Sequence, residues 1–239
     1  MDRKNGLDWM DYGARHFAGH GQWTSPDPLA ENYYDVSPYV YCVGNPIKFV
    51  DSDGEDVWIF YKDNKGREDI FHFNGAENIT HSNPFVNDFL ESYYYLNQHG
   101  AGKNISELVK NSKYKVFVYH TEGISSTESY RGIAHIWWDS RAGIQTTDGG
   151  LQSPALQLEH EFDHARSRLI DLPSNLDRSK QYDAQYDNAE EKRVITGSEK
   201  DSAIRLGEGV RNNHKGKLYK TTRSTSTQRQ KKRITQHNK

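Results

Sequence analysis

Two histidines and a glutamate lie at the spacing of a zinc site in the second half of the chain. Residues 160–164 read His-Glu-Phe-Asp-His. On a helix, His160 and His164 project from one face about one turn apart, so both imidazoles can reach one Zn²⁺ at roughly 2.0–2.1 Å. Glu161 is rotated by about 100° from His160 and can approach a metal-bound water. This is the HExxH arrangement, in which the glutamate acts as general base.

The residues around this motif predict the helix that it requires. Ser153 is a preferred N-cap, and Pro154 suits a first helical turn because its missing N–H would be unpaired there. Apolar residues then recur at i, i+4, i+7 and i+11, which indicates a buried face: Leu158, Phe162, Ala165 and Leu169. Asp163 points away from the metal and is expected in solvent. The alternative is an ordinary surface helix, because the bare pattern also arises by chance.

A catalytic zinc needs a third protein ligand and one open position. A second helix is predicted over residues 188–207. At 100° per residue, the apolar residues 194–195 place Glu191 near the middle of the inward face, with Glu190 to one side. We therefore predict Glu191 as the third ligand and Glu190 as the group that orients His164. The alternative is that both acids only complement the helix macrodipole.

Metal-assisted hydrolysis of an amide also needs proton transfer and a donor to the oxyanion. Glu161 is expected to take a proton from water and pass it to the leaving amine. Arg211, and His214 or Tyr219, follow the second helix and are the candidate oxyanion donors, with a solvated basic stretch as the alternative. His135 lies on a predicted strand beside two tryptophans, and we expect it to be half-buried, with a structural role and no part in catalysis.

The remaining elements indicate an α+β fold, in which a small mixed sheet packs against the active-site helix. Residues 133–139 are predicted to form an edge strand that an extended peptide could join. Residues 173–187 are polar and are expected to form a loop. The other predicted elements are strands over 57–61 and 114–119, and a helix with Phe85, Phe89, Tyr93 and Leu96 on its buried face, ended by Gly100.

Charge is unevenly distributed along the 239 residues. Residues 211–239 hold ten Lys or Arg and no acid, which leaves 21 bases against 33 acids in the rest. The tail over 220–239 has little to bury and is expected to be disordered. Its basic run lacks interleaved aromatics, so we do not expect a nucleic-acid partner. Cys42 stands alone, which excludes an intrachain disulfide. We find no membrane span and no classical signal peptide.

The first 55 residues, punctuated by Gly and Pro, predict short strands and turns. Several stretches resemble, in matching order, the C-terminal end of the RHS repeat-associated core domain: residues 11–15 (DYGAR), 21–31 (GQWTSPDPLAE), 37–41 (SPYVY), 45–47 (NPI) and 51–54 (DSDG). The resemblance implies a β-rich remnant that would cap a shell of repeats, which this chain lacks, and a toxin domain after it. Residues 51–54 lack the proline that the family usually has there, which argues against self-cleavage.

A second, independent resemblance covers residues 130–215. Its motifs are 153–155 (SPA), 160–165 (HEFDHA), 190–195 (EEKRVI) and 207–211 (GEGVR), and together they resemble the NleD-like effector zinc metallopeptidases. The resemblance implies a zincin-like domain over 56–219: a zinc endopeptidase of a bacterial toxin. It would be a secreted effector, delivered as part of an RHS-type toxin, that cuts a protein substrate in a target cell, with a cognate immunity protein as possible partner.

Two other functions remain open at this point. One is a nonenzymatic orphan RHS tail, either a decoy or a fragment. The other is a nucleic-acid-binding toxin that uses its basic tail.

Overall fold

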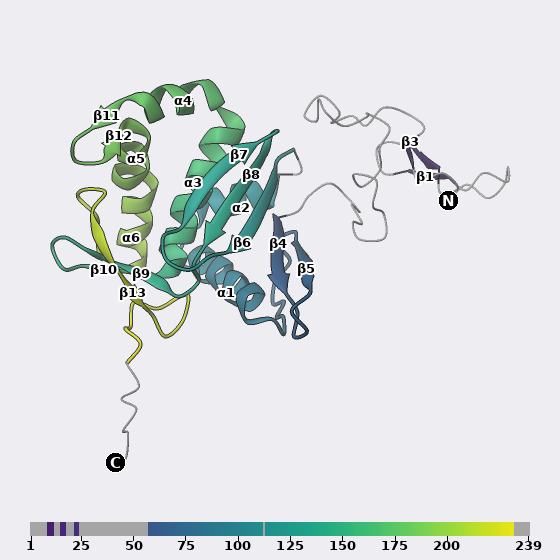
Figure 1. The fold of residues 1–239 in the computed structure, drawn as a ribbon, viewed down its shortest axis with the longest axis horizontal. Helices are drawn as coiled ribbons and strands as arrows, with labels where there is room; N and C mark the ends of the chain where they lie inside the picture. The colour runs from purple at the N-terminus through teal and green to yellow at the C-terminus, as the bar shows by residue number, and fades with distance from the viewer. Residues whose placement is uncertain (1–8, 12–14, 18–21, 24–56, 112, 232–239) are drawn as a thin grey trace, which may run out of the picture.

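The computed structural model describes residues 57–111 and 113–231, together with the backbone of three short strands before them. These strands are β1 (Trp9–Asp11), β2 (Arg15–Phe17) and β3 (Gln22–Trp23), which pair antiparallel in the order β1-β2-β3 (Figure 1). Short strands are what the Gly- and Pro-punctuated sequence predicts. The boundary at residues 51–54 lies outside the described part of the chain.

A mixed five-stranded sheet forms the centre of the fold, in the order β5-β4-β6-β8-β7. Strands β4 (Val57–Lys62), β6 (Lys115–His120) and β8 (Ile133–Trp138) run parallel, close to where they were predicted. The outer strands β5 (Glu68–Phe73) and β7 (Ser126–Tyr130) are antiparallel to their neighbours. The prediction that β8 is an edge strand is therefore wrong. The polar strand β7 pairs with its outer side and becomes the edge.

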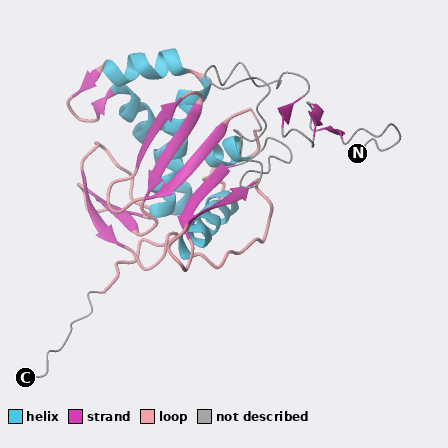
Figure 2. Cartoon of the chain, turned by 45° about the vertical axis from the view of Figure 1, so that its right-hand side comes forward, coloured by secondary structure: helices cyan, strands magenta, loops and turns pink. Residues whose placement is uncertain are grey.

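Three helices cover one face of this sheet: α1 (Pro84–Gln98), α2 (Lys103–Val109) and α3 (Pro154–Ile170) (Figure 2). Helix α1 begins at Asn83, whose side chain accepts hydrogen bonds from two backbone N–H groups of the first turn. Its predicted apolar stripe is buried throughout. Gly100 adopts φ 65°, a left-handed conformation that glycine tolerates, and the chain leaves the helix there.

Helix α3 carries the histidine motif and runs through the middle of the molecule. It begins where predicted, with the Ser153 side chain accepting from the backbone N–H of Leu156 at 3.3 Å. Residues 154–165 are all buried, and Leu158 and Phe162 have no exposed surface. The indole N–H of Trp138, on β8, donates to the carbonyl of Pro154 at 2.9 Å. The motif is thus held rigidly beneath the β8–β7 side of the sheet.

A second group of elements lies beside α3. Helix α4 (Leu172–Lys180) is followed by the short strands β11 (Tyr182–Asp183) and β12 (Asp187–Asn188). The loop predicted over 173–187 is therefore partly wrong. Pro173 in the first turn and a buried hydrogen bond from Asn175 to Ser167, 3.1 Å long, hold the polar segment as a surface helix.

The helix predicted over 188–207 forms with an interruption. It consists of α5 (Ala189–Val194), a π turn (Ile195–Glu199) and α6 (Lys200–Leu206). The backbone departs from helical geometry at Gly197, with φ −104° and ψ −106°. Gly207 ends α6 with φ 68°, as expected for a C-terminal cap.

The C-terminal segment is folded further than predicted. Strands β9 (Ala142–Thr146), β10 (Leu151–Gln152) and β13 (Gly216–Lys220) form a small antiparallel sheet in the order β10-β9-β13. Beyond it, Ser224 is fully buried, and its carbonyl accepts from the backbone N–H of Ala155 at 2.9 Å. The expectation of a disordered tail is thus wrong for residues 220–231, because backbone and hydroxyl hydrogen bonds, not apolar burial, hold them. Residues 232–239 lie outside the described part.

The fold is therefore mixed α+β, as predicted, with a small mixed sheet against the motif helix. Within the described residues, every helix falls short of the length and apolarity that crossing a membrane demands.

Candidate metal centre

Three side chains from two helices converge on one point. The Nε2 atoms of His160 and His164, both on α3, lie 3.1 Å apart. The carboxylate of Glu191, on α5, places one oxygen 3.2 Å from His164 Nε2 and the other 3.4 Å from His160 Nε2. The structure thus brings the three predicted ligands together as a cluster that could hold a metal ion.

The cluster fits a tetrahedral zinc site. Bonds of roughly 2.0–2.1 Å at tetrahedral angles place neighbouring ligand atoms about 3.3 Å apart, close to the distances found here. Glu191 Oε2 is buried and has no hydrogen-bond partner. A buried carboxylate oxygen without a donor is costly, and a cation at the centre of the cluster would satisfy it. Two imidazoles and a carboxylate are also a donor set that Zn²⁺ accepts.

His160 is held from behind by a buried carboxylate that the sequence analysis did not identify. Glu199, at the end of the π turn, is 1% exposed and has an oxygen 2.8 Å from His160 Nδ1. Arg211 pairs with the same carboxylate through a short contact, and its Nε donates to it at 2.8 Å. Gln152 donates a further hydrogen bond, 2.9 Å long. An acceptor at Nδ1 fixes the tautomer that leaves Nε2 free for a metal.

His164 has an equivalent, looser partner. Glu190 Oε1 lies 3.7 Å from His164 Nδ1, on the side away from Glu191. Two arginines hold this buried carboxylate, with Arg178 Nε at 2.5 Å and Arg193 Nη2 at 2.7 Å. The two carboxylates lie where helical phase predicts them, with Glu191 at the Nε2 side of His164 and Glu190 at its Nδ1 side.

The π turn explains how one helix supplies carboxylates to both nitrogens of one imidazole. Glu191 and Glu199 are eight residues apart, and in an uninterrupted α-helix they would be rotated by about 80° and separated by about 12 Å along the axis. The interruption at Gly197 redirects the chain, so that Glu199 reaches Nδ1 while Glu191 faces Nε2. Such π turns frequently mark functional sites.

The electrostatics of the cluster favour protons on the imidazoles when no cation is bound. Burial by itself lowers the pKa of His160, but Glu191 and Glu199 outweigh it and raise this pKa to about 10. Burial likewise opposes the charged form of His164, while Glu190 and Glu191 raise its pKa. Burial would raise the pKa of Glu191, yet the two imidazoles beside it hold this pKa well below its usual value. A metal ion must therefore displace protons to bind.

Glu161, the predicted general base, is held by the edge strand. The hydroxyl of Thr127, on β7, donates to Glu161 Oε2 at 2.8 Å. Glu161 is 6% exposed and lines the same cavity as His160. One of its oxygens is thereby fixed, and the carboxylate is oriented within the site.

His214 reaches the cluster from the loop before β13. Its Nε2 lies 3.6 Å from Glu191 Oε2, and its Nδ1 makes a short contact with the carboxylate of Asp187. The side chain is half-exposed and lines the cavity. The contact with Asp187 orients the imidazole so that its Nε2 faces the cluster.

The other candidates from the sequence occupy different places. Arg211 is committed to Glu199 behind His160, so its geometry suits positioning better than oxyanion binding. The hydroxyl of Tyr219 donates to the carbonyl of Thr227 at 3.0 Å. His135 is half-buried on the main sheet, as expected. The prediction that Asp163 is solvated is wrong: it is 3% exposed, because it accepts from Arg193 at 2.6 Å.

A cavity of about 150 Å³ opens beside the cluster. Its lining includes Ile124, from the loop before β7, and Ile144 and Leu218, from β9 and β13. Ile124 and Leu218 are 78% and 44% exposed. A cavity of this size can take a benzene-sized group. The polar floor of His160 and Glu161 therefore lies between apolar walls.

Three site residues were missed in the sequence, namely Thr127, Asp187 and Glu199. Thr127 and Asp187 carry no local signal, because only the sheet and the β11–β12 hairpin bring them to the motif. For Glu199 the sequence carried a weak local signal, because Gly197 inside a predicted helix indicates a departure from α-helical geometry.

Comparisons with protein-family models, curated proteins and solved structures gave no match for this chain.

Proposed function

We propose that this chain is a zinc-dependent endopeptidase of the zincin type. The observation that carries the proposal is the triangle of His160, His164 and Glu191, with the carboxylate of Glu161 in the same cavity. Three protein ligands with an open side are typical of catalytic zinc, whereas structural zinc has four. Within the described residues, neither a fourth His, Cys, Asp nor Glu completes the set.

Zn²⁺ held by these residues would polarise a substrate carbonyl and lower the pKa of a bound water towards about 7. Glu161 then accepts the proton of the attacking water through the oxygen that Thr127 leaves available, and passes it to the leaving amine. His214, polarised by Asp187, donates to the oxyanion that forms at the carbonyl. Arg211 and Glu199 keep His160 in its metal-binding tautomer.

The substrate we propose is an extended peptide. The edge of β7 lies beside α3, and its Thr127 reaches Glu161, so a strand added to this edge would run past the site. The apolar walls at Ile124 and Leu218 suit a hydrophobic side chain next to the scissile bond. The two resemblances in the sequence extend the proposal to a bacterial effector toxin, delivered behind an RHS core and acting on a protein in a target cell.

Proteolysis by the Glu161→Gln variant tests this function. Replacing the base should lower cleavage of an unstructured protein such as casein by about 10²–10⁴-fold, while the zinc content stays at the wild-type level. A matched control is Glu107→Gln, a glutamate on α2, about one-third exposed, that pairs with Arg166 and with no residue of the motif, and this variant should leave both unchanged. Equal cleavage by the Glu161 variant would contradict the proposal.

A further inference from the structure

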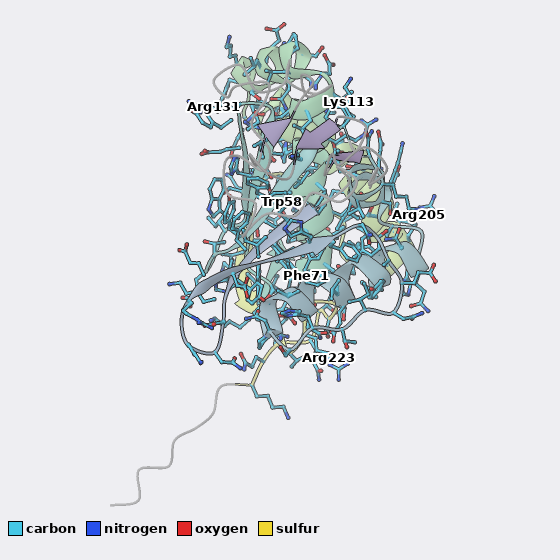
Figure 3. All side chains as sticks on the ribbon, turned by 90° about the vertical axis from the view of Figure 1, so that its right-hand side faces the viewer. Trp58, Phe71, Lys113, Arg131, Arg205 and Arg223 are labelled. Carbon is cyan, nitrogen blue, oxygen red and sulfur yellow. The ribbon has the colours of Figure 1, made fainter. Side chains whose placement is uncertain are left out.

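The edge strand beside the metal centre carries acids and no bases. Residues 121–130, which comprise the loop before β7 and the strand itself, contain Glu122 and Glu128 but no Lys, Arg or His. Both glutamates are exposed. The first base after them, Arg131, follows β7 at the end away from the cavity-lining loop, and its guanidinium lies 4.9 Å from the centre of the Tyr130 ring (Figure 3). The edge that passes the metal centre is therefore acidic.

Glu128 faces away from α3, on the side of β7 opposite to Thr127. Side chains alternate along a strand, and the burial of β7 follows this alternation. Thr127 is buried against Glu161, whereas Glu128 is exposed. Across from Glu128 on β8 lies His135, and burial lowers the pKa of this imidazole further than Glu128 raises it. The carboxylate of Glu128 thus has a neighbour within the sheet that is uncharged at neutral pH.

A peptide strand that pairs with the outer side of β7 repeats this alternation. Within the described residues, β7 pairs with β8 alone. The peptide residue opposite Thr127 then points towards Glu161 and the metal centre, while the residue opposite Glu128, one position along the peptide, points to the other face of the sheet. Directly opposite residues of paired strands have Cβ atoms about 4.5–5.5 Å apart. The second of these peptide side chains therefore meets the carboxylate of Glu128.

We propose that Glu128 selects substrates with Lys or Arg one residue from the side chain that enters the metal cavity. This inference rests on the proposed function and names the substrate class: an extended peptide in which a hydrophobic residue adjoins a basic one. Ile124 and Leu218 favour the hydrophobic residue, and Glu128 favours its neighbour. An exposed cross-strand pair of opposite charges should favour a basic residue over a neutral one by about two- to fivefold. An acidic residue there should be disfavoured by a similar factor.

Cleavage of matched peptides tests this preference. Three quenched fluorescent peptides carry Lys, Gln or Glu directly before a central Leu and are otherwise identical, and a second set places the variable residue directly after the Leu. With the zinc-loaded full-length chain, kcat/KM should fall in the order Lys, Gln, Glu in at least one set. Raising the salt concentration should reduce the difference, because an exposed charge pair is screened. Equal kcat/KM for the three peptides in both sets would overturn the inference.

Charge reversal assigns the preference to one residue. Glu128→Lys should invert the order, so that the Glu peptide is cleaved faster than the Lys peptide. The matched control is Glu68→Lys, which changes an exposed glutamate on β5, at the opposite edge of the sheet. Figure 3 looks onto that edge, with Phe71 of β5 labelled. The control should keep the wild-type order. A wild-type order in Glu128→Lys would refute the assignment.

The inference and the proposed function fail in different ways. If neither casein nor any of the peptides is cleaved, the hydrolase proposal fails, and binding of the same peptides, labelled with fluorescein, still tests the edge. In fluorescence anisotropy with the zinc-loaded chain, affinity should then follow the order Lys, Gln, Glu and reverse in Glu128→Lys. Cleavage without a charge preference overturns the inference alone. A chain that neither cleaves nor binds any peptide overturns both.

Discussion

Replacing Glu199 by Gln separates the buried support of His160 from the metal ligands themselves. Glu199 is 1% exposed and accepts from Arg211 and Gln152 while it faces His160 Nδ1. The variant leaves the guanidinium of Arg211, 6% exposed, without its counter-charge. Breaking a buried ion pair from one side costs about 3–5 kcal/mol of folding free energy. Loss of the group that orients a histidine ligand lowers metal affinity by about 10–100-fold.

Two assays measure these effects. Urea denaturation of the metal-free chain gives the change in unfolding free energy, and competition with a chromophoric chelator gives the zinc affinity. The control is Glu107→Gln, which removes the ion pair between Glu107 and Arg166. The two side chains are 2.7 Å apart and each is about one-third exposed. This control should lower the unfolding free energy by about 1 kcal/mol or less and leave the zinc affinity unchanged.

A second substitution distinguishes charge from packing. In Glu199→Gln with Arg211→Met, the buried charge is gone, so much of the lost stability should return, whereas the zinc affinity should stay low. The reasoning is refuted if Glu199→Gln matches Glu107→Gln in both assays, because Glu199 would then neither balance Arg211 nor orient His160.

Three further outcomes are expected. Thr127→Val should lower kcat several-fold at unchanged zinc content, because Glu161 loses its 2.8 Å donor; steady-state kinetics with metal analysis would show it. Zinc affinity should rise with pH by about tenfold per unit for each imidazolium proton displaced, since the pKa of His160 is about 10 and protons compete below it; chelator competition at several pH values measures the slope, and a flat profile contradicts it. Glu159→Ala should destabilise the fold by about 2–5 kcal/mol in urea, because this buried carboxylate accepts from Asn104 and Ile105 at the start of α2.

The convergence of the three candidate ligands was predictable because local rules decide it. The i, i+4 spacing places His160 and His164 on one face of a helix. The start of that helix at Ser153 follows from the preference for serine at an N-cap. The choice of Glu191 over Glu190 followed from helical phase alone, and the two carboxylates lie on the sides so predicted. Each of these inferences depends on residues within a few turns of one another.

Other features depended on contacts between distant segments. The edge of the sheet is β7, which pairs with β8, and the polar sequence of residues 126–130 did not predict a strand. Residues 220–231 are ordered through hydrogen bonds such as that from Ala155 to Ser224, which composition does not reveal. Asp163 is buried because Arg193 arrives from another helix. In each case a polar segment gained a partner that no local pattern records.

The most direct test of the metal centre is the zinc content of the purified full-length chain. Elemental analysis should give about one zinc per chain, as one site of three protein ligands requires. Glu191→Ala should lose this zinc, whereas Glu190→Ala, which removes only the carboxylate behind His164, should retain it at saturating zinc. A chain that binds no zinc, or one whose zinc survives the Glu191 substitution, would contradict the account.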